Sequence, residues 1–333
     1  MSHVVDENQA FIDEWTISSR LLFYTVVIIS VMALPMLVAS LIYVMLRRKS
    51  QFVSYLCSIL SANMVLLGTL FASVIIEKMN IIDDWLPGSI SCKATAFLVN
   101  TSSCFIHWTW VVMYAQRFLF VFYPLRARRS RWKSYYILTG VLISSALLQL
   151  WTLLFITSRH VDVSFHDVER IYCGDDPSYS SRSKIIIIFV ECVIAFFIPL
   201  TLTILADISV LMFKNSCHEQ FTLVANEEIG DGTRKQSNMK IVSSNTIRSS
   251  ERRRSMAIRR CLASATINLL LNLPNYSLQL FDEFYPLRNN PSTDVRRKFL
   301  KIDAFVYILY LLQFLISPLY IFILTRNVKR RPS

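Results

Sequence analysis

The chain has 333 residues, of which 53% are hydrophobic and only 17% are charged, a balance that excludes an ordinary soluble domain. Its apolar runs are about 20 or more residues long, twice the length of a barrel strand, and glycines number only 6, so membrane-spanning helices are favoured over a β-barrel. The net charge of +12 would suggest a nucleic-acid partner for a soluble protein. Here the basic residues gather in loops between apolar runs, which predicts membrane lipids and not nucleic acid as their partners.

The apolar runs predict an all-α, seven-transmembrane bundle within residues 21–325. The polar, acidic residues 1–20 lack the basic start, apolar core and cleavage site of a signal peptide. Residues 214–254 are rich in Ser, Asn, Arg and Lys, which predicts a disordered loop, and residues 326–333 form a short tail. The predicted spans are 21–46, 54–76, 93–120, 135–157, 185–213, 256–281 and 302–324.

The basic residues also predict which way the bundle faces. An odd number of spans places the two termini on opposite sides of the membrane. The loops and tail on the C-terminal side hold 23 of the 35 Lys and Arg residues. The positive-inside rule therefore predicts an outer N-terminus and a cytoplasmic C-terminus, loop and tail. No internal repeat is visible, which disfavours a transporter built from two similar halves.

Two of the seven cysteines, Cys92 and Cys173, fall in segments predicted to face outward, where oxidation is expected. The other five lie in spans or on the reducing side. A bridge between the two would tie the loop 159–184 to the start of the third span, and two free thiols are the alternative.

Residues for catalysis or metal binding are not arranged in any workable pattern. No Ser/His/Asp or Cys/His set is suitably placed, and none of the five histidines pairs at metal-ligand spacing. His107 and Trp108, midway along the third span, are interpreted as helix packing. The sequence therefore predicts no enzyme, no metal and no cofactor.

Several motifs match one known family in residue type and spacing. The residues from Trp85 to Cys92 read Trp-x-x-Gly-x-x-x-Cys, and Arg117 follows Cys92 by 25 residues. In these motifs, which extend over almost the whole chain, the sequence resembles the rhodopsin-like G-protein-coupled receptor family, as a divergent member. The resemblance includes one proline in each of the last three spans: Pro199, Pro274 and Pro318.

The resemblance implies a plasma-membrane receptor that takes up an extracellular ligand and activates a heterotrimeric G protein. It implies a Cys92–Cys173 bridge, and it implies that Arg117 meets the G protein once the sixth span swings outward near Pro274. The residues expected to act in this coupling are Gln116, Arg117, Phe118, Asp207, Pro274 and Pro318.

The sequence departs from the family pattern at the coupling motifs. Gln116 replaces the acid that normally precedes the arginine, and Ser317 replaces an asparagine before the last proline. Asp207 is predicted to replace the missing acid as the partner of Arg117, because an unpaired acid within a membrane is expensive. These departures keep open a non-signalling receptor that scavenges or scaffolds. Ser255 follows three arginines and is a candidate phosphorylation site, although a basic stop against anionic lipid is the favoured explanation of that run.

The class of ligand is narrowed by two residues that amine and light receptors of the family carry and that this sequence lacks. Val99 occupies the position of the aspartate of amine receptors in the family, and Leu311 that of the lysine of light receptors. Glu191 is a charge inside the fifth span, and is interpreted as a ligand contact or as an internal hydrogen-bond partner. A neuropeptide with a cationic residue is predicted, with a small chemosensory molecule as the alternative. The predicted lining of an outer cavity is Asn100, Ser103, Glu191, Asn275, Tyr276, Gln279, Asp303 and Tyr307.

Overall fold

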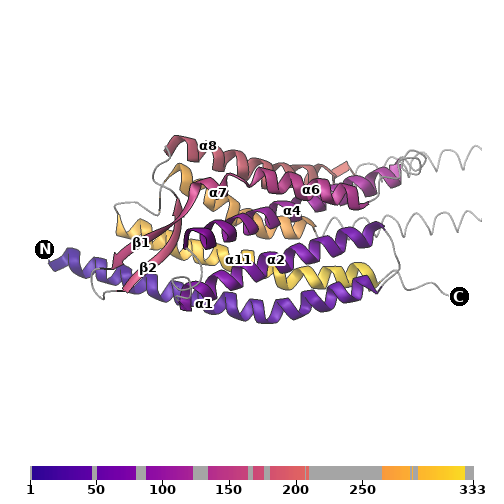
Figure 1. Cartoon of the computed structure of the whole chain (residues 1–333). Coiled ribbons are helices and arrows are strands. Elements are labelled where there is room, and N and C mark those ends of the chain that lie inside the picture. Colours follow the sequence, from indigo (N-terminus) through magenta and orange to yellow (C-terminus); the bar gives the residue numbers. More distant parts are fainter. Residues whose placement is uncertain are drawn as a thin grey trace, which may run out of the picture.

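Seven helical segments and one β-hairpin make up the described part of the chain (Figure 1). The computed structural model describes residues 2–46, 51–79, 88–122, 134–163, 168–175, 181–206, 208–209, 265–285, 287 and 292–326. The helices run side by side, which confirms the predicted all-α seven-helix bundle. The hairpin and the start of α1 lie at the same end of the bundle (Figure 1), here named the hairpin end.

Each helical segment overlaps one predicted span, in order. Within the described residues, five segments are long and apolar enough to cross a membrane. α4 and the helix 265–284 complete the bundle and hold more polar residues. The segments are α1 (Ser2–Met45), α2 (Gln51–Met79), α4 (Gly88–Phe122), α6 (Ser134–Leu148) with α7 (Thr152–Phe155), α8 (Ser181–Cys192) continued by the π-turn η1 (Val193–Phe197) and the helix to residue 206, the helix 265–284, and α11 (Thr293–Arg326).

The hairpin occupies part of what the sequence analysis treated as the loop 159–184. β1 (Ile156–Val163) pairs antiparallel with β2 (Val168–Asp175), and Ser158 lies opposite Cys173. β1 carries β-branched residues at both ends, and β2 carries Val168 and Ile171, residue types that favour extended backbone. Pairing of the strands satisfies backbone groups that a helix no longer satisfies. Ile156 and Thr157, predicted to end the fourth span, therefore begin β1 instead.

Helices α1, α2, α4 and α11 share the main apolar core. Helix α2 contributes its largest part, through residues that recur three and four positions apart and so share one face. Helix α1 buries one face and exposes large apolar side chains on another, a surface suited to lipid and not to water. The fully buried residues of α2 are Tyr55, Leu56, Ile59, Leu60, Leu66 and Leu67, and exposed residues of α1 include Tyr24, Ile28, Val31, Met32 and Ile42.

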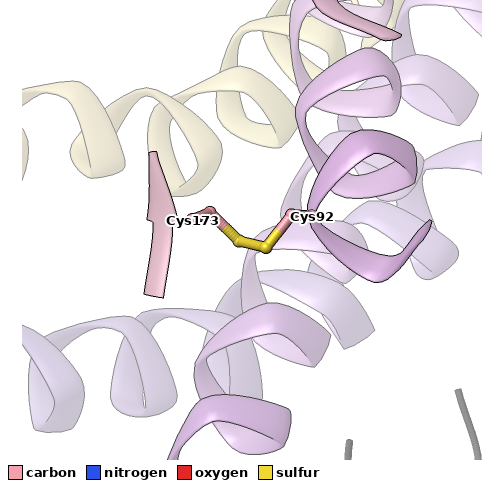
Figure 2. The surroundings of a disulfide bond; sticks show 2 residues. All are labelled: Cys92 and Cys173. Atoms are coloured by element: carbon pink, nitrogen blue, oxygen red, sulfur yellow. A yellow bond between two sulfur atoms is a disulfide. The ribbon is translucent and has the colours of Figure 1, made fainter. Parts of the chain in front are cut away.

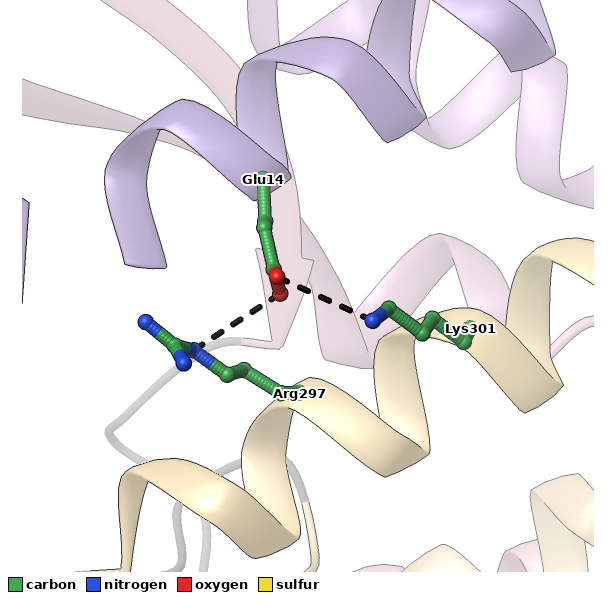
Figure 3. Close-up of polar contacts among 3 residues, drawn as sticks. All are labelled: Glu14, Arg297 and Lys301. Carbon is green, nitrogen blue, oxygen red and sulfur yellow. Dashed lines mark ion pairs between the residues drawn. The ribbon is translucent and has the colours of Figure 1, made fainter. Parts of the chain in front are cut away.

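Helix α1 is much longer than a membrane requires. Its 44 residues extend about 66 Å, roughly twice the hydrocarbon thickness of a bilayer. Near its start, Glu14 forms ion pairs with α11, to Nε of Arg297 at 3.6 Å and to Nζ of Lys301 at 3.7 Å (Figure 3). The two helices are thus joined at the hairpin end, beyond their apolar contact.

Candidate functional site

A disulfide joins helix α4 to the hairpin. Cys92 lies in the second turn of α4 and is buried, Cys173 lies in β2, and their Cα atoms are 5.4 Å apart (Figure 2). The predicted pairing is confirmed. The bridge holds the hairpin against the start of α4.

Ser103 on α4 and Tyr276 on the helix 265–284 meet at the centre of the bundle. Their hydroxyl oxygens are 2.9 Å apart, so one donates a hydrogen bond to the other. The Tyr276 ring stacks on Phe196 of η1 with centroids 4.4 Å apart, and the edge of His107 contacts both rings. Three helices therefore converge on this junction, which we name the polar junction: Ser103, His107, Trp108, Phe196 and Tyr276.

The π-turn before Pro199 explains why His107 and Trp108 lie here. Proline has no N–H, so the backbone donor that would serve the carbonyls of the preceding turn is missing. Ile198 donates to Val193, five residues back, which leaves the Ile194 carbonyl without a backbone donor in either helical register.

Two side chains of α4 supply the missing donors. The indole Nε1–H of Trp108 donates to the Ile194 carbonyl at 3.2 Å, and Nδ1 of His107 lies 3.1 Å from the Ala195 carbonyl. A carbonyl can only accept, so Nδ1 is the protonated nitrogen of this buried imidazole. The interpretation of these residues as helix packing missed this role, although Pro199 in the fifth span was a signal for it.

Glu191 lies on α8, two residues before the π-turn begins at Val193, and is half-buried. Its carboxylate faces the Gln149 side chain, at the turn between α6 and α7, and is within electrostatic range of Cys104 and Tyr276. No ion pair to Glu191 is present among the described residues. Gln149 was missed by the sequence analysis, although an amide in the apolar fourth span was a visible signal.

The remaining predicted lining residues divide into two groups. On α11, Asp303 neighbours Tyr307, whose ring stacks on Tyr310 with centroids 6.0 Å apart, and Tyr310 in turn is within electrostatic range of Tyr276. The structure thus connects the α11 residues with Ser103 and Glu191 through Tyr276. The other three are less engaged: Asn100 and Asn275 are half-buried, and Gln279 is exposed.

A second cross-helix link lies deeper in the bundle. Nδ2 of Asn272 donates to Oε1 of Gln313 on α11 at 2.7 Å and to the Asn268 carbonyl at 2.8 Å. Asn272 comes two residues before Pro274, so this link fixes the helix 265–284 to α11 beside its proline.

The opposite end of the bundle is described only in part. Gln116 is half-buried, and α4 continues as a helix to Phe122. Pro274 is half-buried and Pro318 is buried. The side chains of Arg117 and Phe118, together with Asp207 and Ser255, lie outside the described residues, so the Arg117–Asp207 pairing stays a prediction.

Seven helical segments, five of them long and apolar enough to cross a membrane, with a disulfide from the start of the third to a hairpin after the fourth, are typical of a seven-transmembrane receptor. The family model described as "7 transmembrane receptor (rhodopsin family)" matches residues 34–319. The match covers most of the chain, which therefore belongs to the rhodopsin family of seven-transmembrane receptors, a family of generally non-enzymatic, multi-pass membrane proteins. Among curated proteins, none matches the chain.

Proposed function

We propose that this receptor binds a peptide with a cationic residue at the hairpin end and activates a heterotrimeric G protein at the opposite end. The hairpin end would face the outside of the plasma membrane, in keeping with the disulfide and with the basic loops of the other side. The observation that carries the ligand class is Glu191, a carboxylate inside the bundle that no described cation neutralises.

The route from ligand to G protein runs through the helix 265–284. Tyr276 reaches the hairpin-end half of the bundle, and Asn272, one turn further along, is bonded to Gln313 of α11. A ligand that binds one arrangement of Tyr276 more tightly shifts the population toward that arrangement. Rotation of the helix about Pro274 would then break the Asn272–Gln313 bond and move the G-protein end outward.

The coupling half of the proposal is tested without any ligand. We expect cells expressing the receptor to show basal nucleotide exchange on the G protein that is lost in Arg117→Ala at equal surface expression. Background exchange in both forms, and still no exchange after a peptide that binds the surface receptor has been found, would contradict coupling and favour a scavenging or scaffolding role.

The ligand half is tested with a peptide library read by binding to the receptor. We expect binders to contain Arg or Lys and to lose at least about ten-fold in affinity for Glu191→Gln, since a charge-assisted hydrogen bond contributes about 1.5–3 kcal/mol. Asp294→Asn is the matched control, because it removes an exposed acid at the same end but outside the bundle. Neutral small molecules that bind equally well to Glu191→Gln would instead favour the chemosensory alternative.

A further inference from the structure

The backbone N–H and the backbone carbonyl of Gln149 are both hydrogen-bonded. It lies at the turn between α6 and α7, where its N–H donates to the carbonyls of Ser145 and Ala146, both at 3.2 Å. Its own carbonyl accepts from the N–H of Thr152 at 3.1 Å and from the Thr152 hydroxyl at 2.8 Å. The residue is fully buried, at 0% exposure. The backbone of Gln149 is therefore fixed by the fold, and its side chain is enclosed by it.

The amide of this side chain makes only a weak polar contact, to the Glu191 carboxyl group. Neither Oε1 nor Nε2 reaches full hydrogen-bond geometry with any described residue. A buried polar group in this condition costs about 1–3 kcal/mol. Native proteins rarely leave such a group unsatisfied, and its partner is then a water molecule, an ion or a ligand. A fold that places Gln149 next to an unneutralised carboxylate points to a cationic ligand.

The chemistry around Glu191 suits a planar cation better than a spherical one. A guanidinium donates two parallel N–H bonds to a carboxylate, keeps further N–H groups for an amide oxygen, and stacks on aromatic rings. Glu191 and Gln149 supply the carboxylate and the amide oxygen here, and Tyr276 is an aromatic ring within electrostatic range of Glu191. An ammonium group is compact and strongly hydrated, and gains nothing from the flat rings beyond its charge.

We propose that Glu191 and Gln149 form a guanidinium-binding subsite, in which Glu191 holds the cation and Gln149 selects guanidinium over ammonium. The inference rests on the proposed function, because it narrows the cationic ligand to one with an arginine-like group. It adds Gln149, on the fourth helix, as the residue that decides between the two cations.

The test uses two small probes, butylguanidinium and butylammonium, which share one stem and one charge. The purified receptor in lipid nanodiscs is titrated with each probe while its thermal unfolding is followed. We expect butylguanidinium to bind about ten-fold or more tightly than butylammonium, because it makes at least one more charge-assisted hydrogen bond. Gln149→Leu should reduce that preference to about one, and Glu191→Gln should abolish the shift in Tm with both probes.

The same variants test the inference in the absence of any probe. If Gln149 waits for a ligand, Gln149→Leu removes an unsatisfied amide and should raise Tm by about 2 °C or more. If Gln149 instead serves the fold, the substitution lowers Tm. Ser144→Leu, on the exposed face of the same helix, controls for the added apolar surface.

Three results would overturn the subsite: equal binding of the two cations by the unmodified receptor, a guanidinium preference that survives Gln149→Leu, or a lower Tm in probe-free Gln149→Leu. The probe measurements need no G protein, and the basal exchange measurement with Arg117→Ala needs no ligand. Failure of the subsite and failure of the proposed coupling are therefore separate results.

Discussion

The two sides of the helix bundle are held together by different forces. On the α1–α2 side, polar side chains bond to the carbonyl four residues earlier in their own helix, as Thr25 does to Leu21, Asn63 to Ile59 and Thr69 to Val65. Each of these three bonds lies within a single helix, and apolar packing joins α1 to α2. At the polar junction the bonds run from one helix to another: Ser103 with Tyr276, His107 with Ala195, Trp108 with Ile194, and likewise Asn272 with Gln313.

The contrast indicates which side can act as a switch. Packing between apolar faces in lipid depends on close fit and has no direction, whereas a hydrogen bond is made or lost over a small displacement. A helix that is held by a few directional bonds therefore has discrete positions. The α1–α2 side then serves as the frame, and the helices of the polar junction are the ones that a ligand can move.

The largest effect is expected from the disulfide that anchors α4, the central helix of the junction. Replacing Cys92 and Cys173 together by Ser opens a loop of 81 residues, and should lower the free energy of unfolding by about 4 kcal/mol in the chain-entropy model. Thermal unfolding of the receptor in detergent measures the loss. Cys57→Ser, at a free cysteine of α2, is the control and should have little effect. A double variant as stable as the control would show that the junction needs no anchor.

The frame is tested at two adjacent residues of α2. Leu66 is 1% exposed and Val65 is 47% exposed, so the pair compares a packed position with a lipid-facing one. Leu66→Ala should cost about 2 kcal/mol, at the low end for such changes because lipid, not water, surrounds the separated helices. Val65→Ala should cost less than about 0.5 kcal/mol. Equal losses, measured by unfolding in the same detergent, would argue against a frame held by fit.

The junction is tested at the Pro199 turn. Trp108→Phe keeps an aromatic ring but removes the N–H that the Ile194 carbonyl accepts, and should cost about 1–2 kcal/mol. In a Pro199→Ala background the backbone regains an N–H, so the same substitution should cost less. The unfolding free energies of the two single variants and the double variant give this coupling directly.

A coupling of zero in that cycle would mean that Trp108 stabilises the junction by packing alone. Trp110→Phe, at a buried indole of the same helix, controls for the loss of ring size, and its cost should be the same with and without Pro199.

Much of this architecture could be predicted because it depends on local pattern. The seven spans follow from hydrophobic length, and the Cys92–Cys173 bridge follows from the family resemblance together with the predicted outward placement of both cysteines. The contacts of Ser103 with Tyr276 could not be derived in this way, since residues 173 positions apart meet only through the packing of whole helices. The roles of His107 and Trp108 were missed for a related reason: Pro199 signals that backbone carbonyls lack a donor, but not which side chains of another helix reach them. The amide of Gln149 in an apolar span was a visible signal, but its position next to Glu191 is a property of the folded state alone.

The smallest effect is expected where charge, and neither packing nor a cross-helix hydrogen bond, joins two helices. Glu14 of α1 is paired with Arg297 and Lys301 of α11 at the hairpin end, through side chains that are 33%, 27% and 68% exposed (Figure 3). Ion pairs this exposed contribute about 0–1 kcal/mol and weaken as salt shortens the screening length from about 10 Å at 0.1 M to about 3 Å at 1 M. Glu14→Gln should therefore cost less than about 1 kcal/mol at low salt and nothing measurable in 1 M NaCl, by unfolding at the two concentrations. A larger cost, or one that salt leaves unchanged, would place the first turns of α1 in the frame and extend it beyond the membrane.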